Sequence, residues 1–442
     1  ISTAPPAWKK RKKMGISELP AEPAPREFFA ALTRPCGACG RDVFAAVMDV
    51  AAGGADDCAA CRDFHRRLAD CWRDLTQNPE ELKTIAADAR ARHRLRRIFA
   101  SYGERGVHRP LILPSTLKLE LTSRCNLTCA HCLARAGTAG GVDLPLDAIR
   151  RLLAQGRELG VATVGLVGGE PLLRQDLGDI IDEVGRQRMA FSISTNGMLL
   201  DPRRAELIRR PNLLKVSVSV DGTEDYHNRL RGHPQAYQKT LAGLRLLAEQ
   251  RIKTAVAMVI TRDNCRMVEP VLQAAIACGA AFFVVNDMIP VGRGAEIEHQ
   301  CLPYAEYREH TARVLALSQA YGKRIQVLWK GMRPEGPGDD SLGLFVKSLC
   351  GAALTELTIT PDGYVQPCPF LPRTRENIHA RSLREIWYHS DELKTYQTHD
   401  DLKGGCGKCP RQLSCSGCRA RALGHTGDAK AGDVRCPRCQ EA

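Results

Sequence analysis

The sequence lacks any run of about 18 consecutive apolar residues, the length that a membrane-spanning helix requires. It also lacks an apolar signal core with a small-residue cleavage pattern near its start. We therefore expect a soluble, cytoplasmic protein without a membrane span. With 442 residues, 44% of them hydrophobic and 26% charged, the chain can form about three globular domains, which excludes disorder throughout.

Cysteine, in contrast, is abundant: the chain has 19, and most of them fall in CxxC-type spacings. In an intracellular chain such spacings favour metal binding over disulfides. The formal net charge of +13 counts every thiol as neutral. Metal-bound thiols are deprotonated, so the metallated protein is less basic than this figure. The basic surplus is therefore weak evidence for a nucleic-acid partner, and we expect none.

Composition divides the chain into four segments. Residues 1–30 form a basic, proline-rich tail, and residues 31–112 form a helical domain with several cysteines. Residues 113–325 alternate short apolar runs with amphipathic segments, the pattern of a parallel α/β sheet or barrel. Residues 326–442 are irregular and rich in Gly, Pro and Cys.

Six strands and six helices are expected in the third segment. The strands are Leu117–Leu121, Val161–Val167, Ala190–Ser194, Leu214–Val220, Thr254–Ile260 and Ala281–Val285. The helices are Leu146–Leu159, Gln175–Arg188, Pro202–Arg210, Gln235–Arg251, Met267–Cys278 and Tyr304–Tyr321. The expected fold class is therefore α/β: a partial (βα)6 TIM-like barrel, with a small helical metal-binding N-terminal domain and an irregular, metal-organised C-terminal domain.

A cysteine triplet follows the first expected strand directly. Cys125, Cys129 and Cys132 are spaced CxxxCxxC on a loop at the carboxyl end of that strand, the face of a barrel that carries the chemistry. Three thiolates can hold three irons of a four-iron cluster and leave the fourth iron free for a substrate or cofactor. The alternative is a zinc or electron-transfer site whose fourth cysteine comes from elsewhere.

The loop after the second strand reads Gly168-Gly169-Glu170-Pro171. Together with the triplet, this segment resembles the signature of the radical S-adenosylmethionine (radical SAM) enzymes. The resemblance implies that SAM binds the unique iron through its amino and carboxylate groups, and that the GGE segment meets the amino group. Two glycines allow the backbone to approach a ligand closely, and Glu170 offers an acceptor or counter-charge.

Loops after later strands also resemble the family pattern. Ser194, at the end of the third strand, and Asn196, just after it, match the segment beside the ribose of SAM. Ser219, near the end of the fourth strand, and Arg231, beyond it, match positions that contact the ribose and carboxylate. The alternatives are a strand-end turn for the first pair and a surface arginine for Arg231. The segment 291–294 resembles the family's closing loop, without an assigned contact. No general acid or base is identifiable.

The C-terminal cysteines resemble the SPASM extension of radical SAM enzymes, in which seven cysteines help bind two auxiliary four-iron clusters. The matching residues are Cys350, Cys368, Cys406, Cys409, Cys415, Cys418 and Cys436. The order in the family assigns Cys350, Cys368 and Cys418 to the first auxiliary cluster and the other four to the second. A turn at residues 361–363 would join two short strands and bring Cys350 and Cys368 together.

Two departures from the SPASM pattern leave the number of auxiliary clusters at one or two. Only Ser416 and Gly417 separate the fifth and sixth cysteines, and no cysteine lies shortly before Cys350 to complete the first site. Cys439 also competes with Cys436 as a ligand. Paired CxxC zinc ribbons are the alternative for this segment.

Four N-terminal cysteines form a separate pattern. Cys36 and Cys39 are spaced CxxC, as are Cys58 and Cys61, which suits one tetrahedral zinc or mononuclear iron. We expect a structural metal here, with an electron-entry site as the alternative. Cys71 is left over.

The motifs together predict a SPASM-type radical SAM oxidoreductase. The resemblance implies reductive cleavage of SAM at a [4Fe–4S] cluster to a 5′-deoxyadenosyl radical, which abstracts hydrogen from an unactivated C–H bond of the substrate. The auxiliary clusters would transfer electrons or bind substrate. The substrate is a residue of a peptide or protein, or a tetrapyrrole such as a heme precursor, whose carboxylates the stretch Arg90–Arg97 could attract.

A low-potential electron donor such as flavodoxin or ferredoxin is the expected partner. The rival prediction is a non-enzymatic, zinc-binding nucleic-acid-binding module. That module explains the two ends of the chain but not its middle. Measuring the metal content distinguishes the two predictions, because the enzyme would contain iron and sulfide and the module would contain zinc alone.

Overall fold

The computed structural model describes residues 32, 35–55, 57–76, 86, 114–137, 140–330, 350–397, 401–409 and 417–440. The basic tail, the stretch Arg90–Arg97, Cys415 and the side chain of Cys71 lie outside the described residues. The chain divides into two compact units, residues 1–113 and 114–442. No helix of the described residues is long and apolar enough to cross a membrane.

The N-terminal unit contains helices α3 (Val43–Ala51) and α4 (Ala59–Thr76). The Asp42 side chain caps α3 by accepting a hydrogen bond from the Ala45 amide at 3.0 Å. Phe44 and other apolar side chains of α3 pack against α4 in a small core. Cysteine thiols are part of that core, and a metal bound by them would add the stability that so few apolar residues cannot supply.

The larger unit is built on one nine-stranded sheet, and it confirms the expected α/β class. The strands are β1 (Thr116–Glu120), β2 (Thr163–Val167), β3 (Ala190–Thr195), β4 (Leu213–Ser219), β5 (Thr254–Ile260), β6 (Phe282–Asp287), β7 (Gln326–Trp329), β8 (Glu356–Ile359) and β9 (Val365–Gln366). Their order is β7-β6-β5-β4-β3-β2-β1-β8-β9, and every pairing is parallel except that of β8 with β9.

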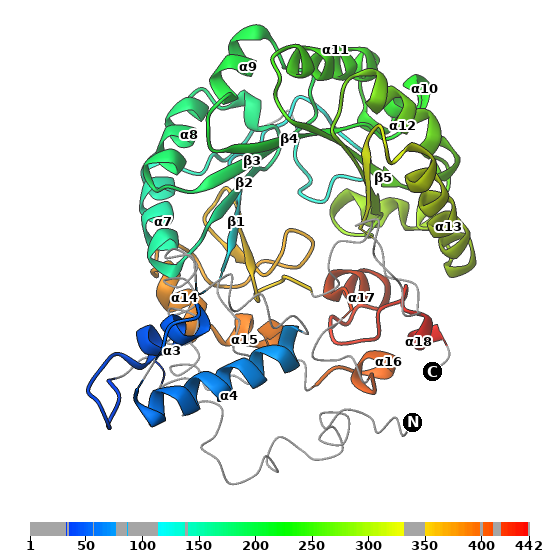
Figure 1. The fold of residues 1–442 in the computed structure, drawn as a ribbon. Helices are drawn as coiled ribbons and strands as arrows, with labels where there is room; N and C mark the ends of the chain where they lie inside the picture. Colours follow the sequence, from blue (N-terminus) through cyan, green and yellow to red (C-terminus); the bar gives the residue numbers. More distant parts are fainter. Residues whose placement is uncertain are drawn as a thin grey trace. The chain divides into compact units, whose positions relative to one another are not determined.

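Helices cover the outer face of this curved sheet, as a partial barrel requires (Figure 1). They are α7 (Leu146–Leu159), α8 (Leu177–Arg186), α9 (Pro202–Ile208), α10 (Glu224–Arg231), α11 (Ala236–Glu249), α12 (Val268–Ala277) and α13 (Tyr304–Tyr321). Three 3-10 helices, η2 (Pro171–Leu173), η3 (Cys265–Met267) and η4 (Gly292–Gln300), follow β2, β5 and β6.

The two faces of each strand differ in chemistry. Leu117 and Leu119 are fully buried, and a Cβ added at Gly156 of α7 would lie 3.1 Å from the Leu117 side chain, so this face meets the helices. Because side chains alternate along a strand, Lys118 and Glu120 point to the opposite, inner face. The inner face is therefore where polar side chains can meet a cofactor or substrate.

The expected elements β1–β6, α7–α9 and α11–α13 all form, with ends within two residues of expectation. The structure adds α10, which is too polar to show an apolar stripe, and two further parallel strands, β7 and β8. The sequence appeared irregular beyond residue 324, because strands this short carry little periodic signal. The turn at 361–363 does join two antiparallel strands, β8 and β9.

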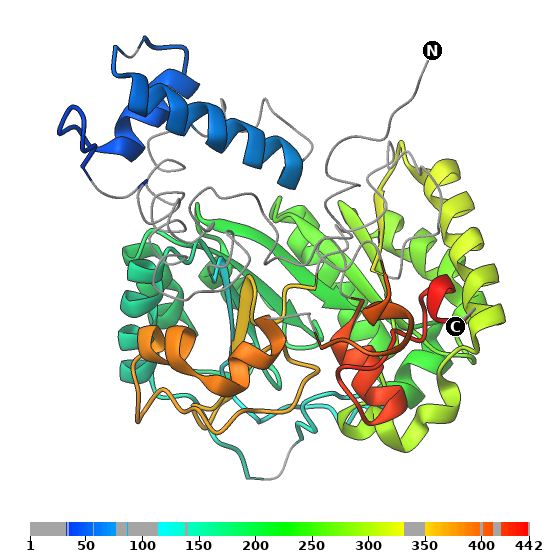
Figure 2. The same cartoon turned by 90° about the horizontal axis from the view of Figure 1, so that it is seen from below.

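The C-terminal segment adds helices α14 (Leu383–His389), α15 (Asp391–Gln397), α16 (Gly404–Gly407), α17 (Arg419–Thr426) and α18 (Pro437–Gln440). Figures 1 and 2 show this segment, coloured orange to red, along the open side of the curved sheet, with α14 beside α7 and α17 toward the α13 end. The segment also extends the sheet, because β8 pairs with β1.

A buried charge network fixes the end of the C-terminal segment to the sheet. Arg435 donates through Nε to Asp287 of β6 at 2.8 Å, and Arg421 of α17 lies 3.9 Å from the same carboxylate. Arg421 also donates to Asp433 at 2.9 and 2.7 Å. All four side chains are buried, so each charge depends on its partners for compensation.

Replacing Asp287 by Asn should therefore destabilise the protein by about 3–5 kcal/mol, because two arginines would stay buried without their shared carboxylate. Anaerobic guanidinium unfolding, followed by circular dichroism, measures the effect. Arg375→Ala is the control: its ion pair with Glu392 is exposed, so its loss should leave the unfolding midpoint almost unchanged. Equal midpoints for the two variants would contradict this role of Asp287.

Candidate active site

The cysteine triplet lies on the loop after β1, and backbone hydrogen bonds define the conformation of this loop. The Cys125 amide donates to the Gly137 carbonyl at 2.8 Å, and the Cys132 amide donates to the Cys129 carbonyl at 3.2 Å. Cys129 is buried, while Cys125 and Cys132 are partly buried. The three thiols therefore sit at the carboxyl end of the first barrel strand, as the sequence predicts.

The loop after β2 lies directly against the cysteine loop. The Gly169 amide donates to the Thr122 carbonyl at 2.7 Å, and the Glu170 amide donates to the Arg124 carbonyl at 2.9 Å. A Cβ at Gly169 would lie only 2.0 Å from the Arg124 carbonyl oxygen, and Gly168 has a φ of 134°. The sequence suggested that these glycines let backbone approach a ligand. In the structure the backbone that they approach is that of the cysteine loop.

Glu170 joins the loops after β2 and β3. Its carboxylate is fully buried and accepts hydrogen bonds from the Leu172 amide (3.1 Å), the Thr195 hydroxyl (2.7 Å) and the Asn196 amide (2.8 Å). Burial raises the pKa of Glu170, and these hydrogen bonds oppose the rise. The side chain positions the loops, and its expected contact with the amino group of SAM stays a prediction.

Two further expected residues lie at the thiols. The side-chain amide nitrogen of Asn196 donates to the side-chain oxygen of Asn126 at 2.8 Å and lies 4.0 Å from the Cys125 sulfur. The Arg231 guanidinium, at the end of α10, lies 3.7 Å from the Cys129 sulfur. Arg231 is thus a buried residue of the site rather than a surface arginine.

The remaining two expected residues lie on neighbouring strands. Ser194 of β3 has an exposed side chain, and Ser219 of β4 is partly buried. Strand alternation places both on the inner face. Their contacts with the ribose of SAM stay predictions.

Asp221 is a positioning residue that the sequence did not single out. It is fully buried, lies 2.5 Å from an Arg231 terminal nitrogen, and accepts from the Val259 amide at 2.9 Å. Burial by itself would raise the pKa of Asp221, but the positive charge of Arg231, together with smaller contributions from His131, His227 and the Val259 amide, lowers it below its usual value. Its position in the segment 219–222, two residues after Ser219, was the available signal.

The loop after β6 also contacts the cysteine loop through its backbone. Arg293 donates from its side chain to the carbonyls of Cys129 (2.8 Å) and Ala136 (2.9 Å), and its amide donates to the Cys132 carbonyl at 2.9 Å. A Cβ at Gly292 would lie 2.2 Å from the Leu133 carbonyl oxygen. The segment 291–294, to which the sequence assigned no contact, therefore holds the cysteine loop in place.

Burial favours the protonated form of Cys125 and Cys129 in the absence of a metal. Burial raises the pKa of Cys125 to about 11 and raises that of Cys129, where Arg231 opposes the rise. Cluster binding must therefore displace protons. His131 lies between Cys129 and Cys132 in the sequence. Burial lowers its pKa to about 4, so it is neutral at physiological pH.

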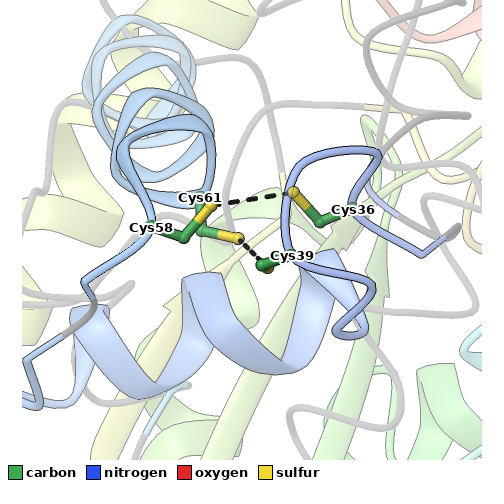
Figure 3. A group of neighbouring side chains, drawn as sticks. All are labelled: Cys36, Cys39, Cys58 and Cys61. Carbon is green, nitrogen blue, oxygen red and sulfur yellow. Dashed lines mark hydrogen bonds between the residues drawn. The ribbon is translucent and has the colours of Figure 1, made fainter.

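The four N-terminal cysteines converge on one point. Their sulfur atoms all lie within 4.8 Å of one another, and the side chains point toward a common centre (Figure 3). The sulfurs of Cys36 and Cys58 are 3.8 Å apart, as are those of Cys39 and Cys61. Tetrahedral coordination with zinc–sulfur bonds of about 2.3 Å requires a sulfur–sulfur separation of about 3.8 Å. These residues therefore fit a single metal ion.

The triplet is spaced differently. Within the described part of the chain, the N-terminal cysteines are the one group of three or more candidate ligands close enough for a single ion. Thiols of the triplet lie farther apart, which fits a cluster in which each cysteine binds a different iron.

The C-terminal cysteines form two groups. Cys350, Cys368 and Cys418 share one buried apolar cluster, where burial and the neighbouring Cys418 raise the pKa of Cys350 to about 11. In the second group the sulfurs of Cys406 and Cys439 are 3.8 Å apart.

Cys436 also faces Cys439, so both candidates for the last ligand lie in the second group. Cys409 lies two residues after α16, and its amide donates to the Cys406 carbonyl at 3.3 Å. Asp433 links the two groups, because its carboxylate accepts from the Cys418 amide at 2.6 Å and its own amide lies 3.4 Å from the Cys406 sulfur.

Comparison with known proteins agrees with this geometry. Residues 119–275 match the radical SAM superfamily, and residues 350–418 match the SPASM iron–sulfur cluster-binding domain. An AdoMet-dependent heme synthase of Methanosarcina barkeri is 27% identical over 332 residues, covering 71% of this chain and 94% of the relative. A PqqA peptide cyclase of Granulibacter bethesdensis is 27% identical over 344 residues, covering 74% and 87%.

The fold resembles that of Streptococcus suis SuiB, solved with S-adenosylmethionine bound, with a TM-score of 0.64, 17% identity and coverage of 90% of this chain and 93% of SuiB. Fold and cysteine sites together define an iron–sulfur enzyme on a partial α/β barrel. The chain belongs to the radical SAM superfamily, in the branch that carries a SPASM domain. A zinc-dependent nucleic-acid-binding module would not account for these matches.

Glu120 is a titratable residue that the sequence missed. It is buried on the inner face of β1, and burial together with the negative charge of Asp362 raises its pKa to about 7. A carboxyl group with this pKa exchanges a proton near neutral pH. An acidic residue inside the apolar run 117–121 was the available signal.

Replacing Glu120 by Gln should stabilise the protein at pH 8 but not at pH 4. Below its unfolded pKa the carboxyl is neutral in both states, and stability is lost as the pH rises through the folded pKa of about 7. The gain at pH 8 should approach about 3 kcal/mol. Guanidinium midpoints at the two pH values measure it, with the exposed Glu249→Gln as control. If the difference in midpoint between Glu120→Gln and wild type were the same at pH 4 and pH 8, the pKa of Glu120 in the folded protein would be unshifted.

Proposed function

We propose that the chain is a radical SAM oxidoreductase that holds a [4Fe–4S] cluster at Cys125, Cys129 and Cys132. When bound, cluster and SAM supply reductive cleavage to a 5′-deoxyadenosyl radical that abstracts hydrogen from an unactivated C–H bond. One observation carries the proposal: three thiols lie on a loop that the loops after β2 and β6 hold by backbone contacts. Three thiolates leave one iron for SAM.

The residues around the triplet provide charge and position. Arg231 places a positive charge beside the Cys129 sulfur and thereby favours the thiolate. Asp221 keeps that guanidinium in place. Asn196 lies at the Cys125 sulfur, while Ser194 lies on the inner face, where the ribose of SAM is expected. These groups orient the cofactor and need no conformational change to do so.

The two C-terminal thiol groups are proposed to hold auxiliary clusters. Cys350, Cys368 and Cys418 form the first group, and Cys406, Cys409 and Cys436 belong to the second, with Cys415 as a further ligand from the sequence pattern. Cys439 competes for the second cluster, because its sulfur is 3.8 Å from that of Cys406. The clusters transfer electrons or bind substrate.

The substrate is proposed to be a heme precursor or a residue of a peptide. Support for the first comes from heme synthases, one of which aligns over 94% of its own length. Support for the second comes from the PqqA peptide cyclases. A low-potential donor such as flavodoxin or ferredoxin supplies electrons, and the many cysteines that form no disulfide favour a reducing, cytoplasmic setting.

Reduction of wild-type protein with dithionite in the presence of SAM should yield 5′-deoxyadenosine. The variant with Cys125, Cys129 and Cys132 all changed to Ala should yield none, because it cannot hold the cluster. Cys265→Ala is the matched control, since this cysteine lies on η3 and belongs to no thiol group. Iron near twelve atoms per chain indicates two auxiliary clusters, and iron near eight indicates one. Nucleoside formation by the triple variant would contradict the assignment.

The N-terminal cysteines are proposed to bind one structural zinc or mononuclear iron. Changing Cys39 and Cys58 to Ser should release about one equivalent of that metal per chain, because each tetrahedral edge loses a ligand. Elemental analysis by mass spectrometry measures zinc and iron. Yield of 5′-deoxyadenosine with dithionite should persist if the metal is structural. Loss of that yield would favour the electron-entry alternative.

A further inference from the structure

Among the described residues, several lysines lie on the inner face of the sheet, including Lys118 of β1, Lys215 of β4 and Lys330, directly after β7. Their sequence neighbours Val216 and Trp329 are fully buried on the opposite face. Trp329 contacts the rings of Tyr307 and His310 on α13, which confirms that its side of β7 faces the helices. Strand alternation then directs the lysines inward.

Strand register places two of these lysines in one row. Lys118 pairs with Gly165 of β2, Gly165 pairs with Ser192 of β3, and Ser192 pairs with Lys215. The positions between the lysines thus carry a hydrogen atom and a hydroxymethyl group. A Cβ at Gly165 would lie 3.4 Å from Cγ of Lys118, so the lysine side chain extends over this glycine. The row therefore has two small residues in the middle and a lysine at each end.

The charges of this surface are unbalanced within the described residues. Burial, together with the ammonium groups of Lys118 and Lys215, lowers the pKa of Lys330, and burial together with Lys253 lowers that of Lys215. Glu356 opposes them and is paired with Lys118 at 2.8 Å, and Glu120, whose pKa is about 7, adds a second carboxyl group on the same face of β1. Lys330 remains accessible to water although protein surrounds it, as expected on the inside of a barrel. Like charges so placed attract an anion.

The spacing of the lysines limits what that anion can be. Lys118 and Lys215 lie three strands apart, which is about 14 Å across the sheet at about 4.8 Å per strand. This is the separation of the two backbone positions, so one small ion could contact both lysines only where their side chains converge. A ligand with separated anionic groups can contact both without that convergence, and from Ser192 it is only about 7 Å along β3 to Ser194, on the side of the cysteine loop.

We propose that Lys118, Lys215 and Lys330 bind the carboxylates of the substrate, which is a small molecule with at least two separated carboxylate groups. That the bound molecule is the substrate rests on the function proposed above. The binding site itself rests on the register and on the surplus of positive charge. Among the two substrate classes, this surface favours a tetrapyrrole with acidic side chains over a neutral peptide segment.

Equilibrium binding of coproporphyrin, a tetrapyrrole with four carboxylates, tests the proposal on the fully reconstituted protein. The variant Lys215→Gln/Lys330→Gln should bind it at least about tenfold more weakly, because it removes two charge-assisted contacts with carboxylates. Lys239→Gln, an exposed lysine on α11, is the matched control and should bind like wild type. Lys215→Arg/Lys330→Arg should restore most of the affinity, because it keeps both charges.

Coproporphyrin tetramethyl ester, which has the same ring and no charge, should bind weakly to every variant. Equal affinity of the glutamine variant and wild type, equal binding of acid and ester, or displacement of the porphyrin by millimolar inorganic phosphate would overturn the proposal. The function proposed above fails separately, if wild-type protein forms no 5′-deoxyadenosine. A protein that forms the nucleoside but binds acid and ester alike refutes the lysine site alone.

Discussion

The cysteine loop depends on close backbone contact with the loops after β2 and β6. On one side Gly169 lies against the carbonyl of Arg124, and on the other Gly292 lies against the carbonyl of Leu133. Neither position has room for a side chain, so the sequence must keep glycine at both. These contacts fix the three thiols before any metal binds, and a preorganised ligand set lowers the cost of assembling a site.

Buried ion pairs fix the positions of other residues in the larger unit. Asp221 holds Arg231 beside the Cys129 sulfur. At the carboxyl end of β6, Asp287 is bound to Arg435 in the C-terminal segment. Through Asp433 the same network reaches both groups of C-terminal thiols. Buried ion pairs add little net stability, but they tolerate few alternative arrangements and so specify position.

The sequence predicted what depends on local pattern. Helix α7 has its expected bounds, because its apolar stripe and the following Gly160 are both local signals. The parallel pairing of β8 with β1 joins residues more than two hundred positions apart, and no periodicity reveals it. The same holds for the site: the CxxxCxxC and GGEP motifs are contiguous, whereas the roles of Asp221, Arg293 and Glu120 arise from contacts between distant strands and loops. The row of lysines likewise follows from register, which the sequence does not display.

Electron paramagnetic resonance of the dithionite-reduced protein, recorded before and after addition of SAM, tests the central claim most directly. If the triplet leaves one iron of its cluster without a protein ligand, SAM binds that iron and shifts one component of the signal. Components from auxiliary clusters with complete protein ligation stay unchanged. A spectrum with full iron and sulfide content in which no component responds to SAM would contradict the account.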